Sequence, residues 1–229
     1  MEYLLCRSMS NPDGQSRSVG WLVWGGLALV GLTVLVGLLL AGLRSEESGG
    51  KPLPVIGPVA GFTLTNQNGS VVSLTDLRGR VWVADIIFTR CPGPCVKMTR
   101  QMKELQEALP PTSQAKLVTL TTDADFDTPP VLKAYAERFQ ADTNRWTFLT
   151  GTKQDIAKLA IDSLKLTAIE KKPEERESPQ DLFVHSTLFV IADKQARLRG
   201  VFETTGEGID PQAVKQQILA AVRRLEREP

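Results

Sequence analysis

Two cysteines and one histidine are the residues of this chain whose types and spacing suit metal or redox chemistry. Cys91 and Cys95 are separated by three residues, and His185 is the only histidine among 229 residues. Two thiolates on one short loop can close on a single soft metal ion, because thiolates select Cu(I), zinc or iron–sulfur clusters. With one imidazole they make a three-coordinate set suited to Cu(I), and imidazole also suits Cu(II). A structural zinc site usually takes four protein ligands, and the chain has no second histidine.

The same cysteine pair also suits thiol–disulfide exchange, which would make the protein an enzyme with Cys91 and Cys95 as its catalytic residues. Asp85 lies six residues before Cys91 in an apolar run. Burial raises the pKa of a carboxyl group, and a base that titrates near neutrality suits deprotonation of a thiol. The alternative for Asp85 is a structural role, with a hydrogen bond to the backbone or to Trp82.

Three features weigh against an oxidoreductase and favour a binding protein. Such enzymes usually have two residues between their cysteines, and they usually have proline where Ser186 and Thr187 stand. They also have no need of His185. A peroxiredoxin-like peroxidase fits less well still, because its nucleophilic cysteine works with a threonine and an arginine and not with a neighbouring cysteine.

The elements around the cysteines are predicted by hydrophobic pattern. The near-continuous apolar run over 81–88 predicts a buried strand, and helical spacing over 96–109 predicts a helix that directs Met98 and Met102 into the core. Cys95 should therefore lie in the first turn of that helix. The unpaired N–H groups and the dipole of a helix start favour a thiolate, so we expect a lowered thiol pKa there.

The remaining elements complete an α/β domain. Asn68-Gly69 between two alternating runs predicts an N-terminal β-hairpin. Further strands are expected at 117–120, 146–149, 188–192 and 198–202, and helices from Pro129, over 154–164 and over 211–227. The charged stretch 170–180 is expected to be an exposed insertion, and Asp127 to form part of a helix cap at Thr128. A cysteine pair between a buried strand and a helix start is the thioredoxin arrangement, so the fold class is a thioredoxin-like α/β domain.

The segment Phe88-Thr-Arg-Cys-Pro-Gly-Pro-Cys95 resembles the motif of the Sco/SenC family. The likeness continues in the segment from Thr122 to Phe139 and in His185-Ser186 before an apolar strand, so it covers most of 59–204. The resemblance implies a copper chaperone in which Cys91, Cys95 and His185 bind copper. It implies as partners the cytochrome c oxidase subunit that carries the binuclear copper centre, and other copper chaperones or thiol reductants.

Two positions depart from that pattern. Val96 stands where the family often has proline, which should loosen the start of the helix. Val184 stands where many members have aspartate, which removes a carboxylate beside His185 and is expected to change copper affinity or redox tuning. Asp85 is similar in spacing to the buried aspartate that accepts a thiol proton in thioredoxin-like oxidoreductases.

Composition and charge limit the function classes. The chain has 27 basic and 26 acidic residues, a net charge of +1, so no basic excess points to a nucleic-acid partner. Three cysteines do not make a disulfide-rich scaffold, and Cys6 is expected to lie outside the site.

The uncharged apolar run over 21–43 predicts a single transmembrane helix, since about 20 such residues cross the hydrocarbon core. We therefore expect a short N-terminal segment (1–20), an anchor (21–43), a linker (44–58) and a thioredoxin-like copper-binding domain (59–229). Flanking charges are balanced and say little about orientation. We expect a bacterial inner membrane protein whose soluble domain faces the periplasm.

Overall fold

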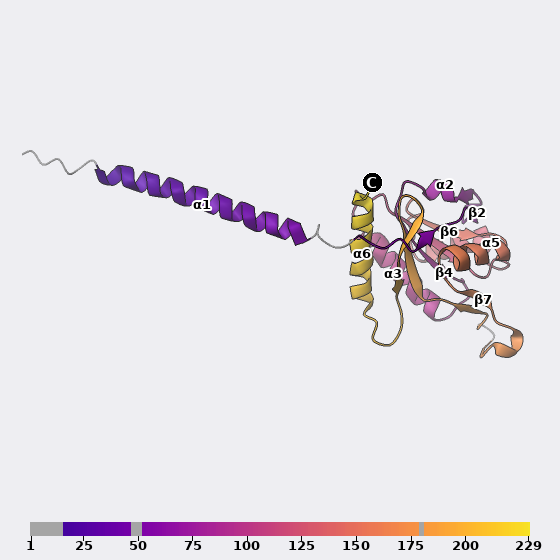
Figure 1. Cartoon of the computed structure of the whole chain (residues 1–229). Helices are drawn as coiled ribbons and strands as arrows, with labels where there is room; N and C mark the ends of the chain where they lie inside the picture. The colour runs from indigo at the N-terminus through magenta and orange to yellow at the C-terminus, as the bar shows by residue number, and fades with distance from the viewer. Residues whose placement is uncertain (1–15, 47–51, 179–180) are drawn as a thin grey trace, which may run out of the picture. The chain divides into compact units, whose positions relative to one another are not determined.

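The computed structural model describes residues 16–46, 52–178 and 181–229, without the side chains of 16–23, 40–46, Ala168 and His185. Two units emerge, one ending at Pro52 and one comprising Leu53–Pro229. In the first, helix α1 (Ser16–Glu46) contains the whole predicted anchor (Figure 1). Among the described residues, no helix meets the length and hydropathy that a membrane crossing needs. The anchor over 21–43 therefore stays a prediction.

The second unit is built on an eight-stranded mixed sheet of order β1-β10-β9-β4-β5-β6-β2-β3. The central strands β4, β5 and β6 are parallel, whereas β9 runs antiparallel to β4, and β2 antiparallel to β6. Strands β4 and β5 are buried along almost their whole length, and β4 lies within the near-continuous apolar run over 81–88 that predicted it. The bounds are β1 (Gly57–Pro58), β2 (Thr63–Asn66), β3 (Val71–Ser73), β4 (Trp82–Ile87), β5 (Lys116–Thr121), β6 (Trp146–Thr150), β9 (Leu188–Ala192) and β10 (Arg197–Glu203).

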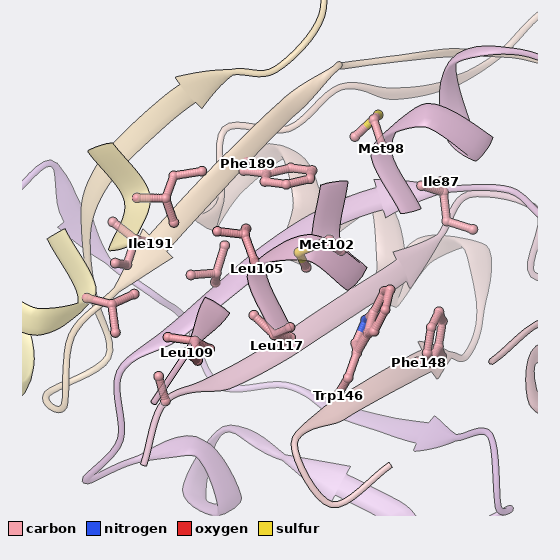
Figure 2. Packing of buried hydrophobic residues seen from close by; sticks show 14 of the residues in the cluster. Ile87, Met98, Met102, Leu105, Leu109, Leu117, Trp146, Phe148, Phe189 and Ile191 are labelled. Carbon is pink, nitrogen blue, oxygen red and sulfur yellow. The ribbon is translucent and has the colours of Figure 1, made fainter. Parts of the chain in front are cut away.

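Helices cover both faces of this sheet. One face packs against α3 (Pro94–Ala108), α4 (Pro129–Arg138) and α6 (Pro211–Arg227), and the other against α2 (Leu74–Leu77), α5 (Lys153–Ala157) and a π-helical turn η1 (Lys158–Ser163). Figure 2 shows Met102 and Leu105 of α3 above Leu117 and Trp146 of the sheet, with Met98 nearer to Phe189 and Ile87. The two methionines are fully buried, which confirms their prediction as core residues.

The predicted N-terminal hairpin is confirmed as β2 and β3, which pair antiparallel. Gly69 has a φ of 78°, a conformation that glycine adopts without steric cost. The side chain of Asn66 accepts hydrogen bonds from the N–H groups of Asn68 and Ser70, which closes the turn.

The stretch 170–180, predicted to be an exposed insertion, is bounded by a separate two-stranded sheet. Strand β7 (Ala168–Glu170) pairs antiparallel with β8 (Phe183–His185), and a 3-10 turn η2 (Pro173–Glu175) lies between them. These two strands project from the lower right of the domain in Figure 1. The charges of this segment therefore belong partly to an ordered hairpin, in which Lys171 pairs with Asp181 at 2.6 Å.

The domain begins earlier than the predicted residue 59, because a buried arginine fastens the preceding segment. Arg199 is only 3 % exposed and donates hydrogen bonds to the carbonyl oxygens of Leu53 and Pro54. It also pairs with Asp193 at 2.8 Å and with Glu228 at 2.7 Å. The end of the predicted linker is thus part of the packed unit.

Candidate metal centre

The cysteine loop begins where the central strand β4 ends. The N–H of Cys91 donates to the carbonyl of Phe88 at 3.2 Å, which turns the chain back toward helix α3. The helix starts at Pro94, so Cys95 lies in its first turn, as predicted. Proline suits the first helical position because its fixed φ is already helical and that N–H would have no helical partner. Pro94 therefore suits the start of the helix, although Val96 stands at the position where the family often has proline.

The two cysteines are present as thiols and are buried side by side. The N–H of Phe88 donates to the Cys95 sulfur at 3.4 Å. Burial raises the pKa of the Cys95 thiol far above its ordinary value, and a hydrogen bond with Cys91 and the nearby charges of Cys91 and Asp85 add to the rise. The expectation of a lowered pKa at the helix start is therefore wrong, because a fully buried sulfur loses the water that would stabilise its thiolate.

A cavity of about 350 Å³ opens beside Cys91. One wall is the cysteine loop, from Cys91 to Pro94, together with Phe88. The β7–β8 hairpin also lines the cavity, with Lys171, Asp181 and Val184 among its residues. Cys91 is thus the cysteine whose surroundings open to the cavity, while Cys95 lies behind it.

His185 is the last residue of strand β8, opposite Ala168. Its side chain lies outside the described residues, so its role as a copper ligand stays a prediction. Two residues earlier on the same strand, Phe183 packs against Phe88 with ring centroids 5.2 Å apart. This contact brings the strand that carries His185 to the end of β4, next to the cysteine loop.

An acidic turn, residues 123–127, holds the start of the cysteine loop. Arg90 donates to the carboxylate of Asp123 at 3.0 Å, and its guanidinium lies 4.1 Å from the centre of the Phe126 ring. Asp127 accepts hydrogen bonds from the backbone N–H of Thr89 at 3.1 Å and from its hydroxyl. The two residues before Cys91 are therefore both fastened to this turn.

The assignment of Asp127 to a helix cap is wrong. Its carboxylate is fully buried and bonds to Thr89 and to the hydroxyl of Thr121, while Thr128, the residue before α4, makes no side-chain cap bond. Burial raises the pKa of Asp127, and the hydrogen bonds from Thr121 and Thr89 oppose that rise. Sequence reasoning missed this role because its partners lie up to 38 residues away along the chain.

Asp85 is fully buried in the middle of β4, on the face that packs against α3. It accepts a hydrogen bond from Thr119 at 2.6 Å, and Trp146 in turn donates to Thr119 at 2.9 Å. The structural partner is therefore the residue directly opposite on β5. Trp82, three residues earlier, lies among the core residues of the other face. The proton-accepting role of Asp85 stays a prediction.

The described donor set fits a soft metal. Two reduced sulfurs lie on one loop, and thiolate is the ligand that Cu(I) prefers. Among the side chains that the structure describes, no three His, Cys, Asp or Glu residues come together as a metal-binding group. The two thiols are thus the described part of a set whose predicted third donor is His185.

Comparison with known proteins is consistent with this geometry. Residues 57–223 match the profile of the SCO1/SenC family. The chain is 36 % identical over 139 residues to a SCO1 protein homolog of Bacillus subtilis, covering 60 % of this chain and 69 % of that protein. It is 32 % identical over 99 residues to a putative copper-binding protein of Stutzerimonas stutzeri, covering 42 % and 47 % of the two chains.

A solved structure shares the fold as well. BsSco, described as a member of the Sco family of cytochrome c oxidase assembly proteins with a disulfide switch, superposes with a TM-score of 0.64 at 28 % identity. The match covers 79 % of this chain and 98 % of BsSco. The predicted thioredoxin-like α/β class is thereby confirmed as the Sco form of that fold.

Proposed function

This chain belongs to the SCO1/SenC family, and from that premise we propose that it binds one copper ion and delivers it during assembly of cytochrome c oxidase. The ligands are Cys91, Cys95 and His185. Copper is the cargo of the protein, carried as Cu(I) on two thiolates and one imidazole, and the imidazole also allows Cu(II).

The observation that carries this proposal is the pair of adjacent thiols at the end of β4, one of them beside the cavity under the β7–β8 hairpin. The hairpin supports the choice of third ligand, because Phe183, two residues before His185 on β8, contacts Phe88 at the end of β4. The likeness to BsSco supports the oxidase as the destination of the copper.

Thiol–disulfide exchange is the second candidate, and the closeness of the two sulfurs favours it. Cys91 and Cys95 share a hydrogen bond, so oxidation could join them. Burial and the raised pKa of Cys95 oppose fast exchange, because the thiolate is the reactive species. We therefore assign metal carriage as the main role.

Delivery is proposed to take place outside the cytoplasm. The apolar run over 21–43 supports a single membrane anchor, and the C-terminal domain is proposed to face the periplasm. Partners are the oxidase subunit with the binuclear copper centre and a copper donor or thiol reductant. Protease treatment of intact spheroplasts tests the orientation: the domain should be degraded, and a fully protected domain would contradict the proposal.

Copper content tests the binding claim. The purified full chain, reduced and loaded with Cu(I), should retain about one copper per chain after dialysis against a weak competing chelator. Cys91→Ser should lose it, because one thiolate is removed, whereas the matched control Cys6→Ser should retain it. Equal retention by both variants would overturn the site.

Delivery needs its own test. Copper-loaded protein mixed with the apo copper domain of the oxidase subunit should lose copper to that domain. The Cys6→Ser control should behave as the parent does. Copper that stays with the donor at equilibrium would contradict delivery and leave only storage.

A further inference from the structure

Lys153, the first residue of α5, joins two segments that are distant in the sequence. Its ammonium group lies 2.8 Å from a carboxylate oxygen of Asp125 and 2.9 Å from one of Glu170. The hydrogen bonds with Asp125 and Glu170 raise the pKa of Lys153, so the side chain carries its charge throughout the neutral range. All three side chains are about half exposed or more, so this is a surface junction.

The Asp125 end of the junction belongs to the acidic turn that holds the cysteine loop. On either side of Asp125, the turn binds Arg90 through Asp123 and Thr89 through Asp127. The carbonyl of Asp123 also accepts the N–H groups of Phe126 and Asp127, which makes the turn locally rigid. Asp125 therefore belongs to a rigid turn that is already bonded to the two residues before Cys91.

The Glu170 end belongs to the hairpin that carries His185. Glu170 is the last residue of β7 and stands opposite Phe183 in β8, while Ala168 stands opposite His185. Arg176 lies 3.8 Å from the other oxygen of Glu170. Because the two strands are paired, a shift in the position of Glu170 would move β8 with it.

We propose that Lys153 is a positioning residue for the copper site, which holds the strand carrying His185 at a fixed distance from the cysteine loop. The inference rests on the proposed copper site. Lys153 itself does not touch the metal. It joins the acidic turn, through Asp125, to the β7–β8 hairpin, through Glu170. The acidic turn is bonded to the residues before Cys91, and the hairpin carries His185.

The expected effect is moderate. Exposed ion pairs are individually weak, and the hairpin keeps a second attachment in the contact between Phe183 and Phe88. Replacement of Lys153 by glutamate should therefore leave the fold intact and shift the hairpin by like-charge repulsion from two carboxylates. We expect Cu(I) affinity to fall by about three- to tenfold at low salt and the loss to shrink at high salt.

The test is a double-mutant cycle on the full chain with Cu(I) as the probe, its affinity measured by competition with a chromogenic chelator. Lys153→Glu and Lys158→Glu, an exposed lysine five residues further on, are each made in the parent and in His185→Ala. Lys153→Arg tests rescue by the conservative change, and thermal melts check folding. If Lys153→Glu fails to fold, Lys153→Gln replaces it.

The inference predicts weakening by Lys153→Glu in the parent, an effect below about twofold in His185→Ala, and near-parent affinity for Lys153→Arg and Lys158→Glu. Equal weakening in both backgrounds, equal weakening by Lys158→Glu, or none at all would overturn it while the copper site stands. A parent chain that binds no copper, or a His185→Ala variant with unchanged affinity, would overturn the copper site and this inference with it.

Discussion

The two cysteines differ in what surrounds their sulfurs. Cys91 lines the cavity, whereas Cys95 is fully buried against Phe88 and Asp85 lies close enough to raise the pKa of its thiol. A metal ion that enters through the cavity would meet Cys91 first. A coordinating thiol is deprotonated on binding, and the bond between the metal and the Cys95 sulfur then offsets the cost of forming a buried thiolate.

Alkylation tests this difference. The reduced, metal-free chain treated with less than one equivalent of iodoacetamide at neutral pH should carry the label on Cys91 more often than on Cys95, because burial hinders access to Cys95 and raises its pKa. Peptide mass spectrometry of the singly modified fraction measures the ratio. A majority of label on Cys95 would contradict the assigned environments.

Asp85 separates copper carriage from disulfide exchange. Asp85→Asn should leave copper stoichiometry unchanged, since the metal itself displaces thiol protons, and should slow any exchange with a model disulfide at neutral pH. The amide still accepts the hydrogen bond from Thr119, so the fold should be retained. Lost copper with unchanged exchange would show that Asp85 supports the metal site instead.

Among the elements, the acidic turn between β5 and α4 holds the two residues that precede Cys91. Asp127 is buried and bonds to the backbone and hydroxyl of Thr89, whereas Asp125 in the same turn is 76 % exposed. The two aspartates therefore differ sharply in what their removal should cost.

Asp127→Ala should lower the free energy of unfolding by about 2–3 kcal/mol, because it leaves the buried donor of Thr121 and the partly buried donors of Thr89 without their acceptor. Asp125→Ala is the matched control, and should change it by less than about 1 kcal/mol. Urea denaturation with an unchanged m-value measures both. Equal losses in the two variants would refute the role of Asp127.

The elements also show what could be predicted. Strand β4 and helix α3 follow from one continuous apolar run and one helical period, which are local signals. The β7–β8 hairpin could not be found this way, since its stability comes from pairs such as Lys171–Asp181 and Phe88–Phe183. The helix expected over 154–164 changes to a π-turn at Lys158, where Leu164 N–H bonds to the carbonyl of Leu159. This wider turn keeps both leucines buried.

At the scale of the whole domain, Arg199 connects the entry of the chain to its end. It binds the carbonyls of Leu53 and Pro54, the β9–β10 turn through Asp193, and the C-terminal Glu228. These contacts lie where β9 ends, and β9 runs antiparallel to β4, so they are at the opposite end of the sheet from the cysteine loop. The segment at Leu53 and Pro54 is thus fastened at the end of the sheet away from the cysteine loop.

Arg199→Met should destabilise the domain by about 3 kcal/mol, because it leaves Asp193 and Glu228 without a buried partner. The exposed Arg223→Met on α6 is the control and should be nearly neutral. Burial favours a raised pKa for Asp193, yet hydrogen bonds from Arg197 and Arg199 hold it below 3.8. Its stabilising contribution is therefore complete above that pH and is lost as the pH falls through the lower folded-state pKa. A melting temperature of Arg199→Met equal to that of the control would contradict the stabilising role of the Arg199 contacts.

Copper K-edge absorption on the Cu(I)-loaded full chain reports the donor atoms of the proposed copper site themselves. We expect two sulfur donors and one nitrogen donor in the parent, and loss of the nitrogen contribution in His185→Ala with the two sulfurs retained. Fewer than two sulfurs in the parent, or a spectrum that His185→Ala leaves unchanged, would contradict the proposed site.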